Sequence, residues 1–267
     1  MIFVCFVIIL FLLTLLIVQK KTIMRLRKRI QILQSECEFA NALRKRDQKS
    51  IGFVVSCKEN SSGVNYLAIG NSITVHSKCE YWFTESGMAA SRIEYDYVHI
   101  VAENLKKKGK QINFLAYNFY IWEAQKNDRT EALEILDSYL CPELNIITIQ
   151  LGENVIEFDT LENDLTQLVK HIKGKSPMAA IVIIGDFWKV EEREKIKERV
   201  CRNTKSFFIS LDDISDKKEY KCGTNAVIYD EEGNEHIVEH SGVARHPNDR
   251  AMKYIADRIM GHIESEI

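Results

Sequence analysis

The sequence predicts a three-layer α/β/α domain with a mostly five-stranded parallel sheet, preceded by an N-terminal transmembrane helix. Short apolar runs alternate with helical patterns over about two hundred residues, as in an open parallel sheet that is covered by helices on both faces. The chain is 46% hydrophobic and 28% charged and has three prolines, so it can bury a large core. Residues 2–18 carry no charged side chain, which is typical of a membrane span.

This first segment, residues 1–19, is predicted to be an uncleaved membrane anchor. As a helix, the apolar run is about 25 Å long, at the short end of what crosses a hydrocarbon core. No basic residue precedes the run and no small-residue cleavage site follows it, which argues against a cleaved signal peptide. The cations that follow favour a cytoplasmic location for the rest of the chain. The seven cysteines, which lack CxxC spacing, do not decide the side of the membrane.

Residues 20–50 form a basic juxtamembrane segment with ten Lys/Arg and three Asp/Glu. Apolar residues recur at spacings of three and four between Ile23 and Ala40, which predicts either a short coiled-coil stalk that forms a homodimer or a single amphipathic helix. The remainder, residues 51–267, carries a formal net charge of −9. This acidic balance argues against nucleic acid as a partner, because binding phosphates requires clustered cations.

Residues 51–267 are predicted to form one domain. Five runs that are rich in β-branched or aromatic residues and almost continuously apolar indicate strands that are buried on both faces. These strands are expected at 66–69, 112–117, 145–150, 179–184 and 206–210. Helical patterns are expected at 92–107, 130–140, 161–172, 191–202 and 249–263. A hairpin is predicted where residues 226–229 and 236–238 flank a turn sequence.

Polar residues stand where the predicted strands end, at the sheet edge where function collects in such folds. The first strand leads into Gly70-Asn71-Ser72-Ile73-Thr74, the third into Gly152-Glu153-Asn154, and His246-Pro247 precedes the last helix. Each segment alone is also typical of an ordinary turn or helix cap. No GxGxxG or GxxxxGK[ST] motif is present, so the sequence gives no support for nucleotide binding of those types.

Taken together and in this order, these segments resemble the SGNH/GDSL hydrolase family. Gly70 to Thr74 resembles its nucleophile block, with Asn71 where aspartate is commoner, and Gly87 resembles the glycine of the second block. Gly152-Glu153-Asn154 resembles the third block and His246-Pro247 the fifth. The resemblance covers residues 66–260, and it implies a flavodoxin-like fold and a serine esterase or lipase activity that needs no metal or cofactor.

The resemblance also implies a role for each matching residue. Ser72 would be the nucleophile and His246 the general base. The oxyanion hole would consist of the backbone N–H groups of Ser72 and Gly87 and the side-chain amide of Asn154. The chain departs from the family at Val243, where an aspartate usually orients the histidine. Either Glu239 or a backbone carbonyl is expected to take over that task.

The sequence therefore predicts a membrane-anchored serine esterase that acts on small acyl esters, including O-acetyl groups on a saccharide. The saccharide is suggested by Trp122 and Trp188, which follow the second and fourth predicted strands. Two alternatives stay open. The missing aspartate would suit a glycan-binding or scaffold module with weakened catalysis. The same serine would also serve an acyltransferase if water were excluded from the acyl-enzyme.

Overall fold

The structure, a computed structural model, describes residues 19–24, 26–27, 29–30, 48–126 and 128–264. The chain divides into two units, Met1–Ser50 and Ile51–Ile267. Almost all of the predicted transmembrane segment (1–19) and much of the predicted stalk (20–50) lie outside the described residues. In the first unit, residues 19–24 are helical. Among the helices that the structure describes, none is both long and apolar enough to cross a membrane.

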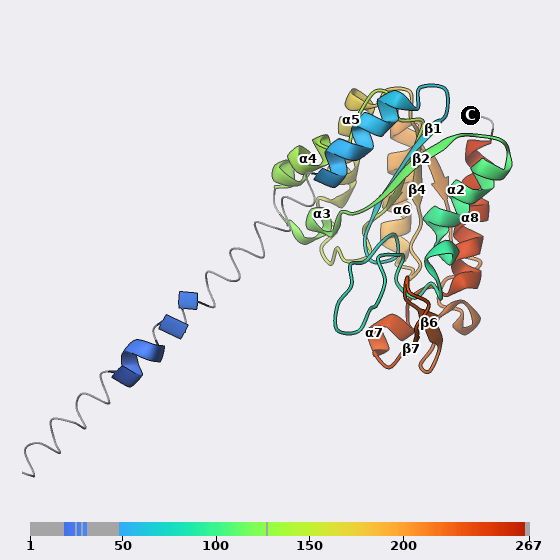
Figure 1. Cartoon of the computed structure of the whole chain (residues 1–267). Helices are drawn as coiled ribbons and strands as arrows, with labels where there is room; N and C mark the ends of the chain where they lie inside the picture. The colour runs from blue at the N-terminus through green and yellow to red at the C-terminus, as the bar shows by residue number, and fades with distance from the viewer. Residues whose placement is uncertain (1–18, 25, 28, 31–47, 127, 265–267) are drawn as a thin grey trace, which may run out of the picture. The chain divides into compact units, whose positions relative to one another are not determined.

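The second unit contains the predicted five-stranded parallel sheet, with the strands in the order β2-β1-β3-β4-β5 (Figure 1). The strands are β1 (Val64–Gly70), β2 (Ile112–Asn118), β3 (Ile146–Gln150), β4 (Ala180–Ile184) and β5 (Phe207–Ile209). The second strand, β2, lies on one side of β1, and the third, β3, lies on the other side. This is the topological switch point at which open α/β sheets bind ligands, just beyond the carboxyl ends of the strands.

Successive residues of β1 enter two different hydrophobic cores, one on each face of the sheet. Tyr66 and Ala68 belong to one core, and Leu67 and Ile69 belong to the other. Because side chains alternate along a strand, burial of both faces produces the continuous apolar run seen in the sequence. The fold class predicted from that pattern is confirmed for this unit.

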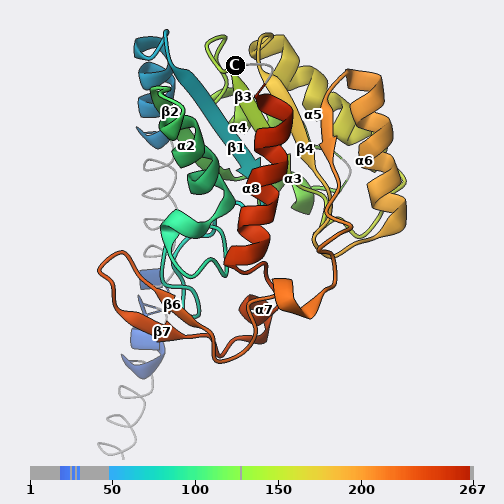
Figure 2. The same ribbon diagram turned by 90° about the vertical axis from the view of Figure 1, so that its right-hand side faces the viewer.

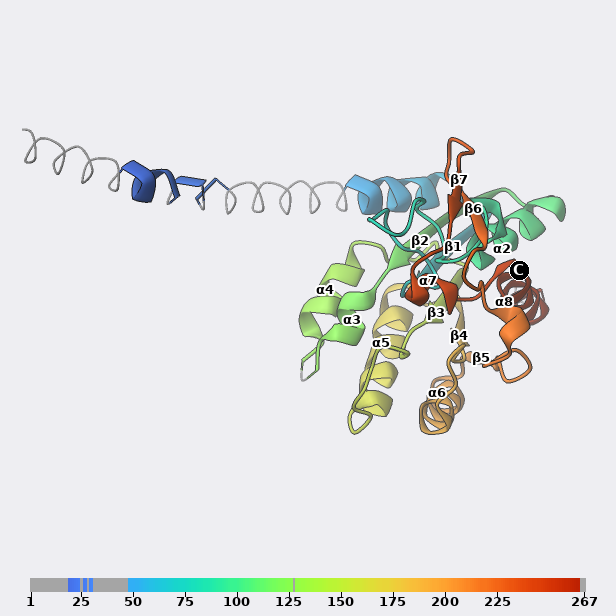
Figure 3. The same cartoon turned by 90° about the horizontal axis from the view of Figure 1, so that it is seen from below.

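Helices cover both faces of the sheet. The Tyr66 face packs against α2 (Tyr97–Lys107) and α8 (Asp249–Ile263), which Figure 2 shows in front of the strands. The Leu67 face packs against α4 (Thr130–Asp137), α5 (Leu161–Lys175) and α6 (Glu191–Thr204), which Figure 3 shows on the opposite side from α2 and α8. Residues 51–59 form a further helix that contributes Phe53 and Cys57 to this second core.

Three predicted helices end two or three residues away from the expected position (α4, α5 and α6), and the helices before and after β2 differ more, for physical reasons. The pattern at 92–107 divides into a 3₁₀ turn (Ile93–Tyr95) and α2, because the Asp96 side chain accepts a hydrogen bond from the His99 N–H (2.8 Å) and caps a new helix. The short helix α3 (Tyr120–Ala124) was not predicted, since five residues are too few to show a helical period.

The predicted hairpin is present as β6 (Val227–Tyr229) and β7 (Glu235–Ile237), and a short helix, α7 (Ser241–Ala244), follows it. These three elements lie together at one end of the unit (Figures 1 and 3). The loop after β1 is attached to the hairpin, because the Phe83 ring stacks on His236 with centroids 3.9 Å apart. The hairpin and α7 lead the chain back to His246 and α8.

Candidate active site

Ser72 lies on a tight turn at the carboxyl end of β1. Asn71 shapes this turn, because its side-chain oxygen accepts a hydrogen bond from the Ile73 N–H (3.1 Å). Gly70 has to be glycine, since a Cβ atom there would lie 1.9 Å from the Thr74 hydroxyl oxygen and 2.8 Å from the Gln150 carbonyl oxygen. The turn is therefore compact and presents Ser72 at the switch point of the sheet.

The structure brings Ser72 and His246 together across 174 residues of sequence. The Ser72 Oγ atom lies 2.9 Å from His246 Nε2, which is hydrogen-bond distance between a nucleophile and its base. His246 precedes α8, and its ring meets Trp188 edge-on with centroids 4.9 Å apart. Packing against this aromatic ring limits how far the imidazole can rotate.

The partner of the other ring nitrogen is a backbone carbonyl. His246 Nδ1 lies 2.7 Å from the Gly242 carbonyl oxygen, to which it donates its proton. Of the two groups expected to orient the ring, a backbone carbonyl takes this position and Glu239 does not, because Nδ1 has one proton and Glu239 is exposed to solvent. Val243, at the position of the family's aspartate, is buried in an apolar cluster with Trp82 and Val238 and has no side-chain group that could accept a hydrogen bond from the ring. Ser72 and His246 form a dyad.

The surroundings of His246 favour its neutral form. The pKa of this histidine is lowered from 6.5 to about 4, mainly by burial and to a smaller extent by the charges of His76, Arg245 and His240, while the bond to the Gly242 carbonyl opposes the shift. At neutral pH, His246 therefore has an unprotonated Nε2 that can accept the Ser72 proton. The low pKa also makes it a weaker base than an ordinary histidine.

Gly87 lies beside the nucleophile turn, but its N–H has another partner. The next residue, Met88, donates its backbone N–H to the Ser72 carbonyl oxygen (2.8 Å), which fixes this loop against the turn. The Gly87 N–H donates to Asp96 Oδ2 (3.2 Å), at the cap of α2. This differs from the prediction that the Gly87 N–H points into an oxyanion hole. Glycine is needed here for packing, because a Cβ atom would lie 2.5 Å from the Ile73 carbonyl oxygen.

Asn154 follows β3, on the other side of the switch point from β2, and its side-chain amide is held by Glu123. Asn154 Nδ2 donates to Glu123 Oε2 at 2.7 Å. The other oxygen, Glu123 Oε1, accepts hydrogen bonds from the backbone N–H groups of Gly152 (2.6 Å) and Asn154 (3.3 Å) and from Asn71 Nδ2 (3.4 Å). One buried carboxylate thus joins the first and third sequence blocks. In the sequence, only the position of Glu123 after a strand points to this role.

A second polar cluster lies just after the carboxyl ends of β3 and β4. Asp186 accepts from Arg193 Nε (2.5 Å) and Lys197 Nζ (2.6 Å). Glu153 accepts from the backbone N–H groups of Phe187 (2.5 Å) and Trp188 (3.2 Å). Burial, together with the negative charge of Asp186, raises the pKa of Glu153 to about 7. Glu153 thereby holds the segment whose Trp188 ring packs on the active-site histidine.

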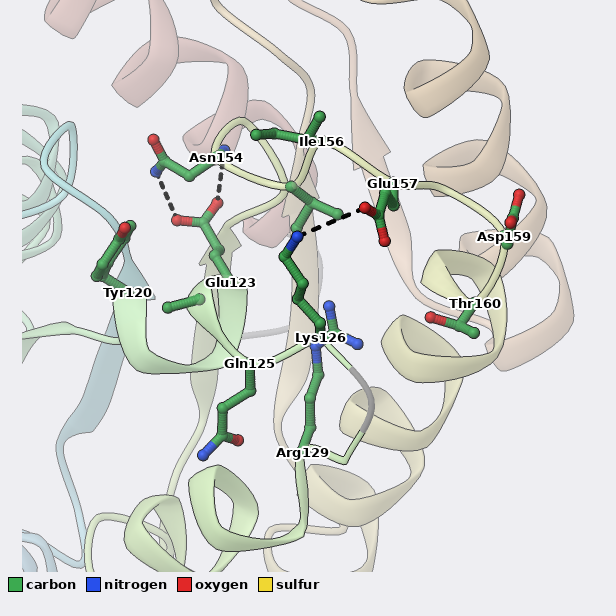
Figure 4. A pocket seen from close by; sticks show the side chains of 12 residues that line it. Tyr120, Glu123, Gln125, Lys126, Arg129, Asn154, Ile156, Glu157, Asp159 and Thr160 are labelled. Carbon is green, nitrogen blue, oxygen red and sulfur yellow. Dashed lines mark hydrogen bonds and ion pairs between the residues drawn. The ribbon is translucent and has the colours of Figure 1, made fainter.

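A pocket of about 350 Å³ opens beside Asn154 (Figure 4). Glu123 and Asn154 face each other at one end, next to Tyr120, and Lys126 reaches across to Glu157. The Tyr120 side chain is 52% exposed and Ile156 is 85% exposed, so both present apolar surface to a ligand. The residues that line the pocket come from α3, the loop after β3 and the start of α5.

Comparison with known proteins identifies the fold. No family model and no curated protein sequence matches the chain. Among solved structures, a two-domain esterase active on acetylated mannans is 16% identical, with a TM-score of 0.50 over 80% of this chain and 54% of the esterase. The psychrotrophic esterase EstA from a Pseudoalteromonas species is 14% identical (TM-score 0.47, covering 75% of this chain and 97% of EstA). A GDSL-like lipase from Bacteroides ovatus is 14% identical (TM-score 0.48, covering 76% and 99%). At this identity, the likeness to the acetylated-mannan esterase shows a shared fold.

Proposed function

We propose that this protein is a membrane-anchored serine esterase that hydrolyses small acyl esters with Ser72 and His246. The observation that carries the proposal is the 2.9 Å contact between Ser72 Oγ and His246 Nε2 at the switch point of the sheet. A serine that merely capped a helix would have no need of a buried imidazole held in place through its other nitrogen.

The geometry supports a two-step mechanism. His246 takes the proton from the Ser72 hydroxyl as its oxygen attacks the ester carbonyl, and then gives that proton to the leaving alcohol. Water then attacks the carbonyl of the acyl-enzyme while His246 takes a proton from it. His246 returns that proton to the Ser72 oxygen as the acid leaves. The backbone N–H of Ser72 and the Asn154 amide supply hydrogen bonds to the oxyanion. The Gly242 carbonyl keeps Nδ1 protonated, so that Nε2 faces the serine.

The proposed substrate is an acylated saccharide, in particular an O-acetyl ester. The pocket beside Asn154 supports this, because it combines the exposed Tyr120 ring with polar groups from Gln125 and Thr160. Sugars are recognised by such pairing of an aromatic face with hydrogen-bonding side chains.

The proposed location is the membrane, with a single span at residues 1–19. The uncharged run at residues 2–18, followed by ten Lys/Arg between residues 20 and 49, supports an anchor whose following domain faces the cytoplasm. Cations next to the span also interact with anionic headgroups, each by about 1 kcal/mol. Dimerisation through residues 20–50 is part of the same proposal.

Labelling with a fluorophosphonate, followed by mass spectrometry of the adduct, tests the esterase proposal. We expect an adduct on Ser72 in the purified full chain and none in Ser72→Ala or His246→Ala. Ser77→Ala, a change at an exposed serine five residues away, is the matched control and should label normally. Protein that has not been treated with the probe should also release acetate from an acetylated saccharide, and labelling should abolish that activity.

The same experiment separates the two alternatives. Folded protein that does not react would contradict the esterase proposal and favour the glycan-binding module. Two features point to that module: valine at position 243 in place of an aspartate, and the hydrogen bond that the Gly87 N–H already donates to Asp96. If Ser72 reacts with the probe and the untreated protein transfers acetyl to an added alcohol faster than to water, the protein is instead an acyltransferase.

A further inference from the structure

The carboxylate of Glu123 has an unusual setting. Its side chain is on α3 and only 4% of the residue is exposed. Among the residues that the structure describes, no Lys or Arg forms an ion pair with it. A buried carboxylate without such a pair requires other hydrogen-bond donors, and is retained only where those donors are well placed.

Glu123 obtains those donors from the two segments that flank the switch point. Three donors converge on Oε1, namely Asn71 Nδ2 and the N–H groups of Gly152 and Asn154. The fourth, Asn154 Nδ2, is bound by Oε2 at 2.7 Å. Gly152 has a φ of +112°, a conformation that suits glycine and turns its N–H toward the carboxylate. Glu123 thus fixes both the backbone and the side chain at Asn154.

The carboxylate decides which way the Asn154 amide faces. A carboxylate accepts hydrogen bonds but donates none, so Nδ2 rather than Oδ1 has to face it. Nδ2 has two hydrogens, and Glu123 takes one of them. The second is left for a ligand. If the amide were reversed, Oδ1 would take the place of Nδ2, and an oxygen lone pair would face the oxyanion in place of a donor.

The support beneath Glu123 is rigid. Arg129 Nε donates to the Trp122 carbonyl oxygen (2.8 Å), and its guanidinium is paired with Asp164 of α5. The Phe119 N–H donates to the Gly70 carbonyl oxygen (2.6 Å), at the end of β1. The short helix is therefore attached both to the nucleophile turn and to the helix layer, so Glu123 cannot follow Asn154 if the amide moves.

We propose that Glu123 is a positioning residue that sets the orientation of the Asn154 amide for oxyanion binding. This inference rests on the proposed esterase function. Glutamine is the informative replacement, because it has the same shape but replaces one oxygen with an NH₂ group. Since donors occupy both sides of the carboxylate, the NH₂ group has to face one of them. Because three donors converge on the Oε1 position, the NH₂ group of the glutamine takes the other position, opposite Asn154. There it favours the reversed Asn154 amide, with Oδ1 as the acceptor.

The test is a double-mutant cycle in the full chain, with an acetate ester as substrate. Glu123→Gln should lower kcat by about a hundredfold, the usual loss of one oxyanion donor, and change KM by less than about threefold. Asn154→Ala should have a similar effect. The double variant should be no worse than Asn154→Ala alone, because Glu123 acts through that amide. Glu134→Gln, an exposed change on α4, is the matched control.

Losses that multiply in the double variant, or a Glu123→Gln variant with full activity, would refute the proposal. If Glu123→Gln does not fold, the side-chain amide signals of Asn154 in the unmodified protein decide, after assignment with Asn154→Ala. Donation to a carboxylate should shift one of the two amide protons strongly downfield, and two ordinary signals would overturn the inference. An unmodified protein that neither labels nor hydrolyses esters would contradict the esterase proposal instead, and the amide signals still test the orientation.

Discussion

The active-site histidine should stay competent far into the acid range. His246 has a pKa of about 4, against 6.5 for an ordinary histidine, because burial and nearby cations disfavour its protonated form. A general base works only when it is unprotonated. At pH 5, a group with a pKa of 4 is about 90% neutral, whereas one with a pKa of 6.5 is about 3% neutral. The structure therefore predicts about thirty times more active enzyme at pH 5 than an ordinary histidine would allow.

The assay is the pH dependence of kcat/KM for a small acetate ester, which reports the pKa of the base in the free enzyme. Product should be separated by chromatography, so that its own ionisation does not affect the signal, and the rate of Ser72→Ala should be subtracted. We expect the acid limb to have its midpoint near 4. Arg245→Gln removes one of the cations that lower the pKa of His246, so its midpoint should move upward.

A midpoint near 6.5 would contradict this prediction, because it would mean that water reaches the imidazole and screens it. Stability should respond in the same pH window. The pKa of His246 is lower in the folded chain than in the unfolded chain, so the unfolded state binds more protons as pH falls from 6.5 to 4. His246 therefore makes the protein less stable over that interval, and His246→Gln should show a weaker acid dependence in urea unfolding.

Three further predictions concern the environment of the dyad. Glu239→Gln should leave the rate of ester hydrolysis unchanged, because the imidazole donates to a backbone carbonyl and not to this exposed carboxylate; a loss of tenfold or more in kcat would contradict that geometry. Asp186→Ala should lower the free energy of unfolding by about 3–5 kcal/mol in urea, because it leaves the buried ammonium of Lys197 without its partner; a loss below about 1 kcal/mol would mean that water reaches the site. Gly70→Ala should abolish fluorophosphonate labelling, since its Cβ would lie 1.9 Å from the Thr74 hydroxyl oxygen; normal labelling would show that the turn can relax.

The layers of the fold, and the positions of Ser72 and His246 at the sheet edge, follow from local patterns in the sequence. Strands buried on both faces, such as β1 and β3, are continuous apolar runs, and helices have a period of 3.6, so both kinds of element can be recognised locally. Ser72 and His246 stand next to a glycine turn and a helix start, and these too are local features. Parallel strands then bring their carboxyl ends to one edge of the sheet, which predicts that the two residues meet.

Which groups complete the site depends instead on contacts between distant parts of the chain. The partner of His246 is the carbonyl of Gly242, and every residue has a carbonyl, so no residue type signals this role. Likewise, the Gly87 N–H donates to the carboxylate of Asp96, nine residues away. Asp96 caps α2, and the helical pattern of the sequence did not predict that a helix begins there. Glu123 reaches Asn154 across 31 residues because a five-residue helix turns it inward. Hydrogen bonds of this kind form only when distant segments are placed to within a few tenths of an ångström, and the packing of the whole domain sets that placement.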